Sequence, residues 1–492
     1  MNIRNPSHAA CCRFESYKVS SEIFSSIGRT AAQKFLIDCS PKIFNNHNKQ
    51  KEKIMASLNS TKKSTPIFTH EGGKATKINL EQELRRSVFA TFLWEDQFYE
   101  SGESIAKRIQ DLVPKVSAQK VSEIAIEART IHNLRHVPLL IVREMARANS
   151  HKHLVAETLE KIICRADELT EFVSIYWKDG RQTLSAQVKK GLAKAFGKFN
   201  EYQLSRNNQK KEVSLKDVLF LCHAKPKDEE QANLWKKMIN DELSFPESWQ
   251  TKLSVPGANK NKVWSELISE KKLGALDVLK NLRNMQDANV DRNLIKKIIS
   301  ETNYSKVLPF RFISAARFAP DFESDLETAM FKNLQEYNKL LGKTLILVDN
   351  SGSMSSPVSS KSDLRRIDAA NALAMIVREL CDDVIVYSFS NSEVKVPNRR
   401  GFALRDAITN SQPMGGTYLG RSLTNIQSKE TYDRIIVITD EQSADRVPDP
   451  IGKNNYMINV SSAKNGVGYG KWTHIDGFSE GVVKYIQEIE SL

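Results

Sequence analysis

The chain has 492 residues, of which 40% are hydrophobic and 27% are charged, a composition typical of globular proteins. This length predicts about two to four domains, and the sequence contains no run of about 18 apolar residues that would span a membrane. Six cysteines are scattered without paired spacing. Their distribution excludes a zinc ribbon or a disulfide scaffold and favours a reducing, cytoplasmic location.

Charge is distributed unevenly along the chain. The net charge is +13, yet residues 341–492 carry 17 basic and 18 acidic side chains. Residues 1–340 therefore hold 55 basic and 41 acidic side chains, a net +14. A basic segment of this kind attracts polyanions, most often nucleic acid, through phosphate contacts and counterion release.

Residues 1–65 are polar, with Ser, Asn and Lys clusters and little periodicity. We expect a disordered N-terminal extension without a targeting signal, although a transit-like segment is an alternative. A second alternative is an upstream extension, because the sequence MASLNSTKK from Met55 reads as a natural start.

Residues 66–325 are predicted to form one helix after another. Apolar residues recur at intervals of three and four in segments such as VSEIAIEARTI and ALDVLKNLRNM. Prolines punctuate the predicted helices, and strand-like alternation is nearly absent. The pattern predicts an α-solenoid of HEAT-like helical pairs.

One stretch of this helical region is strongly basic. Residues 178–216 contain ten basic and three acidic side chains. Lys190 and Lys194 are four residues apart and share one helix face, and Arg206 and Lys210 repeat that spacing beside Lys211. Aromatic residues interleave with them, so the stretch has the groups that contact phosphates and stack on unpaired bases. The alternative is a solvated lysine face over core aromatics.

Residues 340–492 are predicted to be an α/β domain. Short apolar runs at 344–348, 383–389, 434–439 and 456–460 alternate with helical patterns such as residues 366–380. This alternation is typical of parallel strands joined by crossover helices.

Two of the predicted strands stop at an aspartate. Asp349 begins the sequence Asp-Asn-Ser-Gly-Ser, which adds the hydroxyls of Ser351 and Ser353, and Asp440 ends RIIVITD. Thr417 follows Gly415-Gly416 in a third segment. Mg²⁺ prefers hard oxygen ligands of this kind, and loops meet at the carboxyl ends of parallel strands. The five residues resemble the metal-ion-dependent adhesion site of a von Willebrand factor A (vWA) domain; the alternative is a simple Asx/Ser turn.

Segments along residues 75–490 together resemble the Ro autoantigen family of TROVE-domain proteins, in its bacterial branch. The matching segments are RHVPLLIVREMAR, VKKGLAKAF, SLKDVLFLCHAKP, LGALDVLKNLRNM, LPFRFISAARF, TLILVDNSGSM, MGGTYLG and VITDEQS. The resemblance implies an α + α/β fold, in which a ring of HEAT-like repeats (the TROVE domain, 66–325) is closed by a C-terminal, Rossmann-like vWA domain (340–492).

The resemblance also implies partners. Y-like small noncoding RNA would bind the basic outer surface, and single-stranded ends of misfolded RNA would enter the hole of a monomeric ring. In bacterial relatives the Y RNA tethers the ring to the exoribonuclease polynucleotide phosphorylase. The family's RNA contacts correspond to Arg206, Lys210 and His223, to which the charge pattern adds Lys190, Lys194 and Lys211. For His223 the alternative is a buried helix histidine.

The sequence contains no motif of a common enzyme class. A phosphate-binding Gly-x4-Gly-Lys loop, a nucleophile elbow and an HExxH helix are all missing. Binding is therefore predicted rather than catalysis. In adhesion-type vWA domains an acidic partner completes the metal's coordination, so a protein-binding adhesion or scaffold module without RNA is the alternative function.

Overall fold

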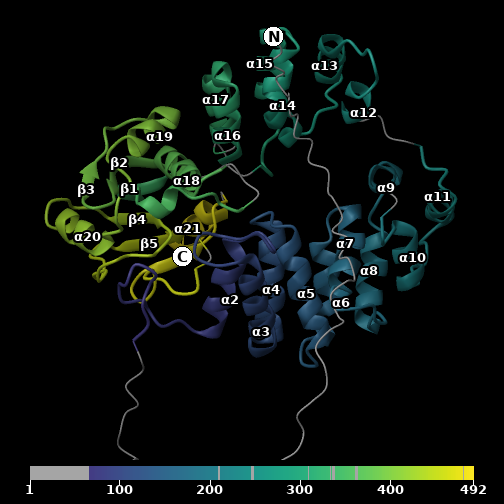
Figure 1. Cartoon of the computed structure of the whole chain (residues 1–492), viewed down its shortest axis with the longest axis horizontal. Helices are drawn as coiled ribbons and strands as arrows, with labels where there is room; N and C mark the ends of the chain where they lie inside the picture. The colour runs from purple at the N-terminus through teal and green to yellow at the C-terminus, as the bar shows by residue number, and fades with distance from the viewer. Residues whose placement is uncertain are drawn as a thin grey trace, which may run out of the picture. The chain divides into compact units, whose positions relative to one another are not determined.

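A computed structural model describes residues 66–208, 211–244, 249–307, 310–332, 334, 338–360, 364–461, 463–479 and 481–491 (Figure 1). The predicted N-terminal extension, residues 1–65, lies outside the described residues. So does Lys210, one of the predicted RNA contacts.

The helical region runs from residue 80 to residue 332. Its α-helices are α2 (Leu80–Phe89), α3 (Gly102–Leu112), α4 (Ala118–Thr130), α5 (His136–Arg147), α6 (Lys152–Ile162), α7 (Ala166–Tyr176), α8 (Ala186–Phe196), α9 (Glu201–Asn207), α10 (Leu215–Cys222), α11 (Glu229–Ile239), α12 (Trp249–Leu253), α13 (Lys260–Ser269), α14 (Ala275–Asp287), α15 (Arg292–Glu301), α16 (Phe310–Phe318) and α17 (Glu323–Lys332). Short 3₁₀ turns cover Val113–Lys115 and Pro320–Phe322. The predicted all-helical region is confirmed.

The helices stack in two layers. In one layer α2, α4, α6, α8 and α10 contact one another in sequence, and in the other α3, α5, α7, α9 and α11 do so. Further along, α13, α15 and α17 form one row and α14 and α16 another. Contacts between alternate helices are what stacked HEAT-like pairs produce.

Local sequence signals set where these helices begin. Asn79 and Gln82 form a reciprocal capping box at the start of α2, and Ser214 and Asp217 form another at α10. Each box satisfies backbone N–H groups that the first helical turn leaves without partners.

The C-terminal domain is a six-stranded sheet in the order β3-β2-β1-β4-β5-β6. The strands are β1 (Leu340–Asp349), β2 (Cys381–Phe389), β3 (Glu393–Lys395), β4 (Arg434–Thr439), β5 (Asn454–Asn459) and β6 (Thr473–Asp476). All neighbours pair in parallel except β2 and the edge strand β3. The four predicted strands are confirmed, whereas β3 and β6 were not predicted because each is short and lacks an apolar run.

Helices cover both faces of this sheet (Figure 1). They are α18 (Arg366–Leu380), α19 (Gly401–Thr409), α20 (Leu419–Gln427) and α21 (Gly481–Ser491). Ile346 and Val348 of β1 face the core shared with α18 and α21, and Leu345 and Leu347 face the core shared with α20. Parallel strands buried on both faces read as continuous apolar runs, which is why these strands were recognisable in the sequence.

The C-terminal domain contacts both ends of the helical series. At one end α16 contacts α18 and α17 contacts α19, and at the other end α2 contacts β6. Helix α2 adds a buried ion pair, in which Arg86 bonds Glu441 in the loop after β4 (1% and 0% exposed side chains). In the described part of the chain, no helix combines the length and apolar character that a membrane crossing requires.

Candidate metal centre and nucleic-acid interface

The predicted metal ligands meet at the carboxyl edge of the sheet. Because β1 and β4 are adjacent and parallel, Asp349 at the end of β1 and Asp440 just after β4 come to the same edge. Backbone hydrogen bonds join the three loops: Gly352 N–H donates to Gly415 O (2.8 Å), and Ala444 N–H donates to Thr417 O (2.8 Å). A Cβ at Gly415 would lie 2.4 Å from Asn391 Nδ2, so a larger residue here would have to displace the Asn391 side chain.

The five predicted oxygen ligands are buried. Asp349, Ser351 and Asp440 are fully buried, and Ser353 and Thr417 nearly so. The Ser351 and Ser353 hydroxyls lie 3.2 Å apart, and the Ser351 N–H donates to Asp349 Oδ1 (2.9 Å). The structure therefore brings together the carboxylates and hydroxyls that the sequence separated by up to 91 positions.

The electrostatics of this cluster favour a cation. Burial, followed by repulsion from Asp440, raises the pKa of Asp349 to about 7. Two buried carboxylates beside three hydroxyls make a hard-oxygen set that suits Mg²⁺, and a divalent ion would relieve the repulsion. Among the described residues no group of three or more His, Cys, Asp or Glu side chains is placed to hold a metal. A metal here would thus need the hydroxyls, as the sequence predicts.

Two further side chains reach Asp440 that the sequence did not suggest. The Tyr99 hydroxyl, from the loop between α2 and α3, donates to Asp440 Oδ2 (3.2 Å). The Arg366 guanidinium at the start of α18 donates to the same oxygen (3.2 Å). Tyr99 is 341 positions from Asp440, and no local pattern in the sequence signals that contact.

The loop after Asp440 is held in place by an ion pair with Arg86 of the helical region. Glu441 has a left-handed backbone (φ 60°), which is rare for a residue with a side chain. Its carboxylate pairs with Arg86 and lies 2.8 Å from His474 Nε2. Burial would raise the pKa of Glu441, but interactions with His474 and Arg86 lower it to about 2. The Glu441 carboxylate therefore stays ionised and holds the loop that carries Asp440.

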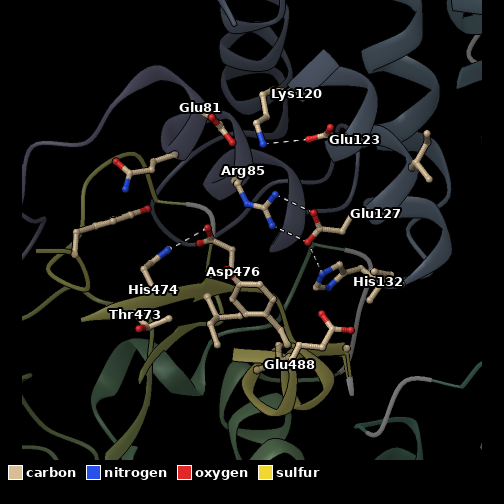
Figure 2. Close-up of a pocket in the computed structure, with 18 of the residues that line it drawn as sticks. Glu81, Arg85, Lys120, Glu123, Glu127, His132, Thr473, His474, Asp476 and Glu488 are labelled. Carbon is tan, nitrogen blue, oxygen red and sulfur yellow. Dashed lines mark hydrogen bonds and ion pairs between the residues drawn. The ribbon is translucent and has the colours of Figure 1, made fainter. Parts of the chain in front are cut away.

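A cavity of about 790 Å³ lies between α2 and α4 on one side and β6 and α21 on the other, and His474 is part of its lining (Figure 2). Arg85 is held by a two-pronged bond to Glu127 (2.8 and 2.6 Å), and Lys120 pairs with Glu123. The acidic side chains of its lining outnumber Arg85 and Lys120; they are Glu81, Glu123, Glu127, Asp476 and Glu488. This excess of acid disfavours RNA phosphates.

Two further hollows share Phe220 and His223 in their linings, and one of them is basic. One, of about 730 Å³, is lined by Trp177, Arg181, Lys189 and His223, together with Glu212 and Asp217. The other, of about 480 Å³, contains His223, Lys225 and Lys236 and no acidic residue in its described lining. Phe220 lines both and is 55% exposed. An exposed ring flanked by cations matches the needs of base stacking with phosphate contact.

His223 lines both hollows. It ends α10 in a left-handed conformation (φ 53°), is exposed, and has Nε2 3.4 Å from the Lys189 ammonium. The alternative of a buried helix histidine is wrong. Lys189, one position before the predicted Lys190, is thus the lysine that the fold brings to His223.

The other predicted RNA contacts lie apart from the hollows, whose described lining includes none of them. Lys190 is exposed on α8, and Lys194 pairs with Glu160 of α6 (3.0 Å). Arg206 is exposed on α9, in the other helical layer, and Lys211 is exposed just before α10. Phe196 and Phe199 are buried, which confirms them as core residues.

The spacing of apolar residues in α10 indicates, from the sequence alone, that Phe220 is exposed. Leu215, Val218, Leu219 and Cys222 are the buried residues of α10, at the spacing of one helical face. Phe220 falls outside that face, so the apolar run VLFLC concealed an exposed aromatic residue.

Two family models match the chain in sequence. The TROVE domain matches residues 236–373, and the Ro60 vWA domain matches residues 343–451. The chain thus carries a TROVE domain and a Ro60-type vWA domain. The predicted resemblance to TROVE and vWA domains is thereby confirmed, and the helical and α/β parts are henceforth called the TROVE region and the vWA domain.

The fold agrees with a solved relative. The crystal structure of the Deinococcus radiodurans Ro (Rsr) protein is similar over 83% of this chain and 98% of its own, with a TM-score of 0.53 and 14% identity. At this identity the likeness concerns the fold. No curated protein matches the sequence.

Proposed function

We propose that this chain is the RNA-binding protein of a small ribonucleoprotein. Proteins of the Ro family bind noncoding RNA. The single observation that carries the proposal is the exposed Phe220, which lines two hollows together with His223. Arg181 and Lys189 line one of these hollows, and Lys225 lines the other. Cations would hold phosphates while the ring stacks on an unpaired base. This surface is the proposed site for a Y-like RNA.

The proposal extends to a ring that takes single-stranded RNA ends. Support comes from the vWA domain, which contacts both ends of the helical series, as closure of a ring by one chain requires. Only a single strand fits a narrow hole, so misfolded RNAs with free ends would be selected. Holding such RNA for maturation or decay, with polynucleotide phosphorylase tethered through the Y RNA, needs positioning and no catalytic step.

The metal site is proposed to be structural for this function. Asp349, Ser351, Ser353, Thr417 and Asp440 would hold the ion, which would supply a positive charge between two buried carboxylates. The chain's own residues already position the three loops by backbone hydrogen bonds.

The RNA that accompanies the protein tests the proposal. We expect wild-type protein purified at moderate salt to carry one abundant small structured RNA, identified by sequencing. A Lys189→Ala/His223→Ala variant should lose most of it, whereas Lys161→Ala, on an exposed pair with Glu157, should keep it. If no RNA is enriched with the wild-type protein, the RNA-binding proposal fails.

Metal removal and salt should separate the two candidate functions. Chelation is expected to lower the melting temperature while RNA affinity is retained, because the proposed RNA surface and the metal ligands share no residue. RNA affinity should fall with salt, by a slope of about −0.7 in log K per phosphate contact with a single strand. RNA binding that is lost on chelation and does not depend on salt would favour the protein-binding alternative. Titration followed by fluorescence anisotropy measures RNA affinity after chelation and at each salt concentration.

A further inference from the structure

A segment of the TROVE region lies directly on the loops of the proposed metal site. The turn at residues 68–74 donates from Thr69 Oγ1 to Ser443 O (2.8 Å) and from the His70 N–H to Gln442 Oε1 (3.0 Å). A Cβ at Gly73 would lie 2.2 Å from Ser443 O, so only glycine allows this approach. The contact is specific, and it covers the loop that begins at Asp440.

Tyr99 enters the site from beside this turn. Its ring stacks on His70 (4.5 Å between centroids) and meets Phe98 edge-on (4.9 Å). Its hydroxyl donates to Asp440 Oδ2 (3.2 Å), and the Arg366 guanidinium lies 5.2 Å from the ring centre. Contacts on several sides hold the ring in one place.

Both carboxylate oxygens of Asp440 accept hydrogen bonds within the chain, and Tyr99 lies on the Oδ2 side. Oδ2 accepts from Tyr99 and from the almost fully buried Arg366, and Oδ1 accepts from the Gln442 N–H (3.3 Å). An acidic ligand that approached this side would meet the Tyr99 ring, and it would have to break the His70 stack to enter.

We propose that Tyr99 closes the metal site from within the chain, in the place that an external acidic ligand takes in adhesion-type vWA domains. The inference rests on the proposed metal site. The metal site would then stabilise the contact between the TROVE region, which supplies Tyr99, and the vWA domain, which supplies the ligands. Proteins that carry an exposed carboxylate could not bind to the metal.

The relaxation of acetate protons by bound Mn²⁺ tests this closure. Mn²⁺ binding is measured first by electron paramagnetic resonance, and acetate is then added as the smallest carboxylate. Wild-type protein should bind Mn²⁺ without enhanced acetate relaxation. Tyr99→Ala should bind Mn²⁺ and relax acetate several-fold more strongly, because the open position is then accessible. Tyr202→Ala, which removes an exposed tyrosine on α9, should behave as wild type.

Two outcomes would overturn the inference in distinguishable ways. Acetate relaxation in wild type equal to that in Tyr99→Ala would show that the site is open and Tyr99 does not close it. Absence of Mn²⁺ binding in wild type, with the same result for Asp349→Ala, would remove the metal site itself. If Tyr99→Ala does not fold, His70→Ala serves as a second variant. It keeps the Tyr99 hydroxyl but removes the imidazole ring that stacks on Tyr99, so it should also admit acetate.

Discussion

Replacing Arg86 with methionine is expected to lower the free energy of unfolding by about 3–5 kcal/mol, because the change takes the guanidinium away from the buried Glu441 carboxylate, which then keeps only His474 beside it. Arg86 and Glu441 have 1% and 0% exposed side chains. The guanidinium also donates to the backbone oxygens of Ala463 and Asn465, so three acceptors lose a donor. Urea titration followed by circular dichroism measures the loss.

Arg85 provides the matched control on the same helix. It also pairs with a glutamate, Glu127, but its side chain is 32% exposed. A pair that water still reaches contributes little, so Arg85→Met should cost no more than about 1 kcal/mol. Equal losses in the two variants would contradict a special role for the Arg86 pair.

A double variant identifies the origin of the loss. Adding Glu441→Gln to Arg86→Met removes the buried charge, so the double variant should recover part of the stability lost by Arg86→Met. Losses that simply add would mean that the two side chains act independently.

Replacing Phe220 with alanine is expected to weaken binding of the copurified RNA by about 1–3 kcal/mol, or roughly fivefold to 150-fold, if one base stacks on the ring. The ring is exposed and lines both hollows beside His223. Its removal should leave the core intact, because the buried residues of α10 are Leu215, Val218, Leu219 and Cys222. Fluorescence anisotropy at fixed salt gives the affinity.

Tyr485 serves as the matched control for Phe220. It is also an exposed aromatic residue, but it lines the cavity in which acidic side chains predominate. Tyr485→Ala should leave RNA affinity unchanged. A Phe220→Ala variant that binds RNA as tightly as wild type would exclude this surface as the stacking site, and an equal loss in Tyr485→Ala would point to a general loss of structure.

Another basic hollow, between α14 and α16, offers a further test of RNA contact. A space of about 320 Å³ between α14 and α16 is lined by Lys280, Arg283 and Arg311, with Phe318 at 48% exposure. If an RNA long enough to reach it is used, Phe318→Ala tests whether this hollow adds a second contact.

The sequence by itself determined the two-part architecture and the composition of the proposed metal site. Helical periodicity and strand runs are local patterns, and strands buried on both faces display them strongly. Asp349 and Asp440 were predictable as neighbours because both end apolar runs, and the carboxyl ends of parallel strands share one edge. The edge strands β3 and β6 escaped prediction because short, half-buried strands carry no such run.

Only the tertiary structure decided which side chains meet at each site. Tyr99 and Arg366 reach Asp440, and Lys189 rather than Lys190 reaches His223, through contacts between segments 34 to 341 positions apart. Charge and spacing select a helix face, but neither specifies which neighbouring helix packs against it. That choice depends on packing and on buried pairs such as Arg86 with Glu441, whose energies arise only once water is excluded.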